Sequence, residues 1–188
     1  MVDYLVWPRA IWKDAVLVLT GSVLIGLMAQ VAIPLPFTPV PVTGQTFGVL
    51  LVGALLGSRR GALSLVLYLL EGIAGLPVFA GGSSGPARLL GPTGGYLLGF
   101  VAGAWVTGWL CERGWDRRMP AAALAMLIGN LVIYLFGLPW LATFVGPEKA
   151  LMMGLWPFIP GDLLKLALAA LALPTAWRLV LGAGRDDP

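Results

Sequence analysis

The chain has 188 residues, of which 59% are hydrophobic and 11% charged, with a mean hydropathy of +0.89 and a net charge of +3. Soluble domains carry about 25% charged residues, so this composition excludes an ordinary soluble fold and favours a helical protein that crosses a membrane several times. Histidine is absent and Cys111 is the single cysteine, which excludes an intramolecular disulfide and any metal site built on these two residue types.

Hydropathy and helix breakers predict an all-α, polytopic membrane protein in which residues 1–188 form one domain with six transmembrane helices. The predicted spans are Ala15–Ile33, Gln45–Leu56, Ala62–Leu76, Gly94–Leu110, Ala121–Leu138 and Asp162–Leu181. The second and third are short, because a bilayer core of about 30 Å needs about 20 helical residues. Between them lies GSRRG, residues 57–61, whose paired arginines are too costly in hydrocarbon. We therefore predict a hairpin of two short helices; the alternative is that one of them enters the membrane only partly.

The basic residues predict an orientation. With six spans, both ends of the chain and the second and fourth loops share one face of the membrane. That face carries nine basic residues, Arg9, Lys13, Arg59, Arg60, Arg113, Arg117, Arg118, Arg178 and Arg185. The opposite face carries only Arg88 and Lys149, while Lys165 lies in the sixth span. Because Lys and Arg accumulate in cytoplasmic loops, we expect both termini to be cytoplasmic and the protein to lie in a bacterial plasma (inner) membrane.

The first outer loop, IPLPFTPVPVTGQTFG over residues 33–48, is unusually apolar for a connector. Its four prolines disfavour a helix and favour extended backbone. We expect the loop to pack against the protein as a cover over a cavity; the alternative is that it rests on the lipid headgroups. A later outer segment, residues 138–161, is too long for a turn, and we expect a short interfacial helix after Pro147.

The second outer loop, residues 75–96, is rich in glycine and carries Arg88 as its single charge. A glycine-rich loop can hold phosphate, but the chain contains no GK[ST] sequence, which excludes a Walker A ATP site. A mobile loop with one arginine suits a small anionic ligand such as a carboxylate. The alternative is that Arg88 contacts lipid headgroups.

Two charges near the start of the last span are the strongest candidates for ligand binding. Asp162 and Lys165 lie three residues apart, so they share one face of a helix. They either neutralise each other or present an acceptor and three donors to a ligand, and ionisable residues inside a membrane are functional candidates by default. Gln45 and Tyr96 are further ligand-binding candidates, whereas we expect an interhelical hydrogen bond from Asn130 in the middle of its span.

The first span contains a pair of small residues, Ser22 and Gly26, spaced to let another helix approach closely. This pair indicates either a partner interface or packing within the chain. An enzyme is not expected, because the sequence shows neither paired carboxylates in one motif nor a serine–base arrangement, and we expect no cofactor.

Four motifs together resemble the BioY family, the biotin-specific substrate-binding (S) components of energy-coupling factor (ECF) vitamin transporters. They are IPLPFTPVPVTGQTFGVLLVGALLG, GLPVFAGG, LLGPTGGYLLGF and PFIPGDLLKLALAA, in this order from the first span to the last. The resemblance implies a six-helix membrane bundle that binds biotin at its extracellular side under covering loops. It also implies that uptake is powered by partners, a transmembrane coupling subunit and two ATPase subunits.

The resemblance also implies roles for individual residues. Asp162 and Lys165 correspond to the family's ligand-contacting pair. From the chemistry of biotin, our hypothesis is that Asp162 accepts from the ureido N–H groups and Lys165 donates to a ligand oxygen. Arg88 either meets the carboxylate or closes its loop. Ser22 and Gly26 are the positions that would face the coupling subunit. The alternatives are an S component for a different vitamin, a membrane-embedded enzyme or a structural bundle partner.

Overall fold

The computed structural model describes residues 11–183, with side chains described for all of these except Ala170 and residues 176–183. This part of the chain is mostly helical: α2 (Ile11–Gln30), α3 (Gln45–Ile73), α4 (Pro86–Leu90), α5 (Gly94–Glu112), α6 (Met119–Val145), α7 (Pro147–Gly154) and α8 (Ile159–Ala183). Two single-turn helices, η1 (Ala80–Gly82) and η2 (Trp115–Arg117), lie in the connections. Strand β1 (Ala32–Ile33) pairs antiparallel with β2 (Val42–Thr43). The predicted all-α class is confirmed.

The number of helices able to span a membrane differs from the predicted six. Among the described residues, α2, α3, α5 and α6 are long and apolar enough to cross a bilayer. A fifth span results if α7 and α8, which are bent by 49° relative to each other, count together. The difference arises at α3, because the two short predicted spans belong to a single helical element.

Helix α3 reverses direction at Gly57, which adopts a positive φ of 85° inside the element. A Cβ on Gly61 would lie 3.0 Å from the Cα of Gly53, and the side chains of Gln45 and Tyr68 are hydrogen-bonded at 2.8 Å. A straight helix would separate the latter pair by about 34 Å. The two halves of α3 therefore pack against each other as a hairpin, although residues 58–61 are helical and not the loop expected from their arginines.

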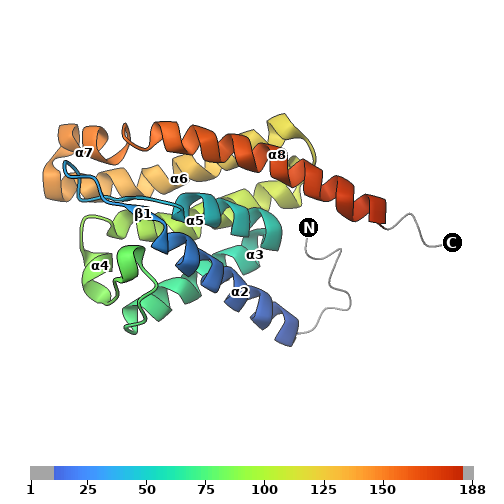
Figure 1. The fold of residues 1–188 in the computed structure, drawn as a ribbon, viewed down its shortest axis with the longest axis horizontal. Helices are drawn as coiled ribbons and strands as arrows, with labels where there is room; N and C mark the ends of the chain where they lie inside the picture. The colour runs from blue at the N-terminus through green and yellow to red at the C-terminus, as the bar shows by residue number, and fades with distance from the viewer. Residues whose placement is uncertain (1–10, 184–188) are drawn as a thin grey trace.

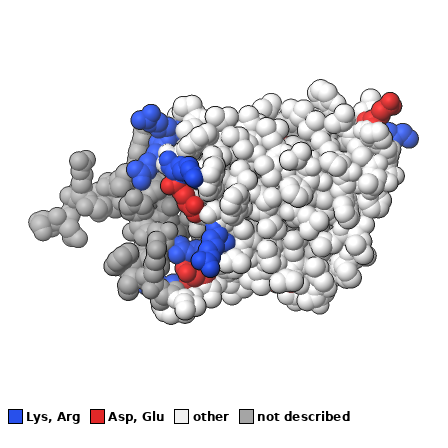
Figure 2. All heavy atoms as spheres, turned by 180° about the vertical axis from the view of Figure 1, so that it is seen from behind, with Lys and Arg blue, Asp and Glu red and all other residues white. Residues whose placement is uncertain are grey.

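The long helices pack in chain order, α2 on α3, α3 on α5 and α5 on α6, while α8 lies along α6 (Figure 1). Helix α2 begins and α8 ends at the same end of the molecule, and α4, β1 and α7 lie at the other (Figure 1). Charged residues gather at the first of these ends, beyond a wide uncharged band (Figure 2). An ion pair of 2.8 Å joins Arg60 to Asp14 there, and Glu112 accepts from the backbone N–H of Ser58 at 2.7 Å.

Helix α6 continues past the end of the predicted span and includes Pro139. Proline is tolerated in membrane helices because neighbouring groups can satisfy the freed carbonyl. The next residue, Trp140, joins α6 to the segment before α5 by donating its indole Nε1–H to the carbonyl of Gly91 at 2.9 Å. The short helix predicted after Pro147 is confirmed as α7. Ala32 and Ile33, predicted to end the first span, instead form β1.

Candidate functional site

One pocket lies at the end of the molecule formed by the loops, and its empty space amounts to about 670 Å³ when the open solvent at its mouth is included. Six segments of the chain line it: the proline-rich loop, the start of α3, the glycine-rich loop with α4, α5, α6, and the α7–α8 region. Its walls are largely apolar or aromatic, from Val40, Phe79, Tyr96, Leu97, Phe100, Ile133, Tyr134 and Phe158. This lining resembles that of small-molecule sites, which are mostly apolar and aromatic with a few polar or charged groups.

The proline-rich loop packs against the protein as predicted. Val40 is buried and, with Pro41 and Thr43, lines the pocket. The hydroxyl of Thr38 donates to the carbonyl of Met153 in α7 at 2.9 Å. This bond ties the loop to α7, and the loop residues that line the pocket confirm the prediction of a cover over a cavity.

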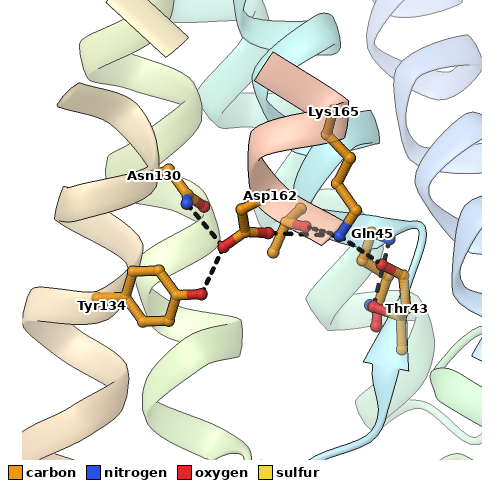
Figure 3. Close-up of polar contacts among 7 residues, drawn as sticks. Thr43, Gln45, Asn130, Tyr134, Asp162 and Lys165 are labelled. Atoms are coloured by element: carbon orange, nitrogen blue, oxygen red, sulfur yellow. Dashed lines mark hydrogen bonds and ion pairs between the residues drawn. The ribbon is translucent and has the colours of Figure 1, made fainter. Parts of the chain in front are cut away.

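Lys165 brings a positive charge to the pocket wall from α8. Its Nζ donates to Thr46 Oγ1 at 2.7 Å and to the carbonyl of Thr43 at 3.0 Å, while Asp162 Oδ1 lies 3.5 Å away (Figure 3). Its three N–H groups are therefore directed at three acceptors, and the contact with the carboxylate is the longest. A ligand oxygen would compete most easily with that longest contact.

Asp162 lies behind the pocket wall, since the residues lining the 670 Å³ pocket include Lys165 but omit Asp162. Its Oδ2 accepts hydrogen bonds from the Nδ2 of Asn130, at 2.9 Å, and from the hydroxyl of Tyr134 (Figure 3). Asp162 instead borders a smaller adjoining cavity of about 160 Å³, shared with Lys165 and Asn130. The carboxylate is thus engaged by protein donors, and the interhelical hydrogen bond expected from Asn130 is confirmed.

Gln45 and Tyr96 both line the pocket, and each is held by a second contact. The Nε2 of Gln45 donates to the hydroxyl of Tyr68 at 2.8 Å, and that hydroxyl donates to the carbonyl of Val78 at 3.2 Å. The hydroxyl of Tyr96 donates to the carbonyl of Gly154 in α7 at 2.9 Å. Both residues therefore join the pocket wall to the loops and short helices around it.

Arg88 also lines the pocket, from α4. Its side chain is exposed, and its guanidinium has no hydrogen bond or ion pair to the described residues. The pocket-lining residues of the described chain include Arg88 and Lys165 but no acidic side chain. The pocket therefore offers positive charge and apolar surface, which suits a ligand that combines an anionic group with an apolar body.

Ser22 and Gly26 lie inside the chain and not on the outer face of α2. Ser22 is fully buried and donates its hydroxyl proton to the carboxylate of Glu71 on α3. Gly26 is buried with the side chain of Val78 at 3.6 Å from where its Cβ would be. These contacts are packing within the chain, and the exposed side of α2 carries Leu19, Val23 and Leu27 instead.

Three groups that contact the ligand-binding candidates were not predicted from the sequence: Tyr134, Thr46 and the carbonyl of Thr43. One signal existed for Tyr134, which follows Asn130 by four residues and so shares its helix face. A backbone carbonyl such as that of Thr43 carries no residue-specific signal in a sequence.

The chain matches the family model described as "BioY family" over residues 5–182. It belongs to the BioY family. A biotin transporter BioY of Rhizobium etli is 41% identical over 169 residues, covering 85% of this chain and 90% of the relative. A probable biotin transporter BioY of Pyrococcus horikoshii is 43% identical over 159 residues, covering 85% and 93%.

A solved structure shares the fold of this BioY chain. The S-component for biotin from an ECF-type ABC transporter superposes with a TM-score of 0.78 at 25% sequence identity, covering 91% of this chain and 95% of that one. As expected from the sequence, the chain is therefore an integral membrane protein of the BioY family.

Proposed function

We propose that this BioY chain binds biotin in the 670 Å³ pocket and is the S component of an ECF transporter, not an enzyme. The observation that carries the proposal is a pocket with apolar walls and two cationic side chains in a member of this family. Biotin has a ureido ring, an apolar thiophane and chain, and a carboxylate. Its apolar parts suit the apolar walls of the pocket, and its oxygens suit the two cationic side chains. Transport energy would come from a coupling subunit and two ATPase subunits, because the chain has no Walker A sequence.

Within the pocket, we propose that Lys165 and Arg88 contact oxygens of biotin, and that Gln45 and Tyr96 complete the wall around it. Asp162 would support Lys165, since its carboxylate already accepts from Asn130 and Tyr134. Ser22 and Gly26 would affect a coupling subunit only through the shape of α2, given their burial.

Titration of the purified protein with biotin tests this function. We expect saturable binding of one biotin per chain, followed by calorimetry or tryptophan fluorescence. Biotin methyl ester, which lacks the carboxylate charge, should bind at least about tenfold more weakly, because a charge-assisted hydrogen bond contributes about 1.5–3 kcal/mol. Binding of riboflavin or thiamine in place of biotin would instead assign the chain to a different vitamin.

We further propose that residues 1–188 form one membrane domain with six crossings, the two halves of α3 each crossing once. The reversal at Gly57 and the packing of Gly61 on Gly53 support two crossings within α3. Lys and Arg side chains gather at the end where α2 begins and α8 ends (Figure 2). This supports a cytoplasmic location for both termini in the inner membrane.

The orientation has a direct test. A fluorescent protein that matures only in the cytoplasm, fused after Pro188, should fluoresce, whereas alkaline phosphatase fused there should be inactive. Fused within the proline-rich loop, at Phe37, the phosphatase should be active. The opposite pattern of activity would overturn the orientation.

A further inference from the structure

Helix α6 supplies two donors that hold the buried carboxylate of Asp162 in place behind the pocket wall. Asn130 and Tyr134 are four residues apart on one face of α6, and both donate to Oδ2 of Asp162 at the start of α8. Asp162 is 6% exposed, so its charge is costly unless it is compensated. The two donors and the Lys165 ammonium provide that compensation within one network (Figure 3).

The two oxygens of the Asp162 carboxylate have different partners in this network. Oδ2 accepts both bonds from α6, and Oδ1 faces Lys165 at 3.5 Å. Two bonds on one oxygen restrict rotation of the carboxylate and so fix where Oδ1 lies relative to the ammonium. The position of Lys165 at the pocket wall then depends on Oδ1, Thr46 and the Thr43 carbonyl together.

We propose that Tyr134 and Asn130 are positioning residues for ligand binding, which act through Asp162 to preorganise the Lys165 ammonium. Tyr134 also contributes to the pocket directly. Its ring lines the 670 Å³ pocket and packs edge-on against Tyr96, with centroids 6.2 Å apart. Its ring is part of the wall, and its hydroxyl is the link to Asp162. The inference rests on the proposed function, since the ligand that reports on it is biotin.

A double-mutant cycle tests the link. Tyr134→Phe removes the hydroxyl and keeps the ring, and we expect biotin affinity to fall about tenfold or more, as for a lost charge-assisted hydrogen bond. In the Asp162→Asn background the same substitution should change affinity by less than about threefold, because the carboxylate through which the hydroxyl acts is gone. Biotin is titrated up to millimolar concentration so that weak binding is still measured.

Tyr96→Phe is the matched control, because it removes a hydroxyl from another tyrosine of the same pocket whose partner is the Gly154 carbonyl. Its effect on affinity should be the same with Asp162 or Asn at position 162. Equal effects of Tyr134→Phe in both backgrounds, or no effect in the natural sequence, would overturn the inference. A protein with the natural sequence that fails to bind biotin would instead overturn the proposed function.

A second cycle does not require Asp162→Asn to retain binding. Tyr134→Phe and Asn130→Ala remove the two bonds to the same oxygen, so the double variant should deviate from the product of the single effects by more than about threefold. Tyr96→Phe combined with Asn130→Ala should give the product. If the Tyr134 and Asn130 effects simply multiply, the two residues do not act on one shared group, and the inference is wrong.

Discussion

Replacing Lys165 with methionine should weaken biotin binding at least about 30-fold. The change removes the pocket's part-buried ammonium and also leaves the carboxylate of Asp162 without its cation. Truncating one partner of a buried, hydrogen-bonded charge pair costs about 2–5 kcal/mol, much of it from the partner left unpaired. Methionine keeps the length and apolar character of the lysine stem, so the loss reports the charge. Calorimetric titration of biotin into the purified variant measures it.

Lys149→Met is the matched control for this variant. Lys149 is exposed on α7, at the same end of the molecule, and does not line the pocket. The substitution is chemically identical, and affinity should stay within about twofold of the natural protein, as expected for a surface charge with little interaction energy. If both lysine variants bind biotin equally well, the ammonium of Lys165 does not bind the ligand.

Lys165 and Asp162 could be identified from the sequence as candidate site residues because charges are rare and costly in this chain. Only 11% of residues are charged, so two charges at the start of an apolar helix required an explanation. Their unequal placement could not be predicted. Lys165 lines the pocket while Asp162 faces α6, and that difference depends on the rotation of α8 against a helix about 30 residues earlier.

The fold, too, was predictable where it depends on local sequence and not where it depends on the packing of distant helices. Apolar composition located α2, α5 and α6, and the paired arginines located the turn inside α3. The burial of Ser22 was not predictable, because a small residue on a membrane helix fits an interface within one chain as well as one between chains. Its actual partner, Glu71, follows 49 residues later and meets it only through the packing of α2 on α3.

Helices α3 and α5 approach each other closely at Gly53, and this contact gives a large expected effect on stability. A Cβ on Gly53 would lie 2.4 Å from the carbonyl oxygen of Ala104 and 3.0 Å from its Cα. These are backbone atoms of α5, which no rotamer change can move. Gly53→Ala should therefore force α3 away from α5 and lower the free energy of unfolding by about 1–3 kcal/mol, the range for overpacked cores.

Gly26→Ala separates this steric effect from the intrinsic helix preference of alanine. Both glycines lie inside helices, where alanine alone would stabilise by about 1 kcal/mol, but the nearest atom to a Cβ on Gly26 is a Val78 side-chain carbon at an ordinary 3.6 Å. We expect Gly26→Ala to unfold in detergent at the melting temperature of the natural protein or slightly above it, and Gly53→Ala about 2–12 °C below it. Equal melting temperatures for the two variants would mean that α3 and α5 can separate at no cost. The hairpin of α3 would then not depend on contact with α5 at Gly53, and the wall of the pocket that α3 and α5 share would be free to move.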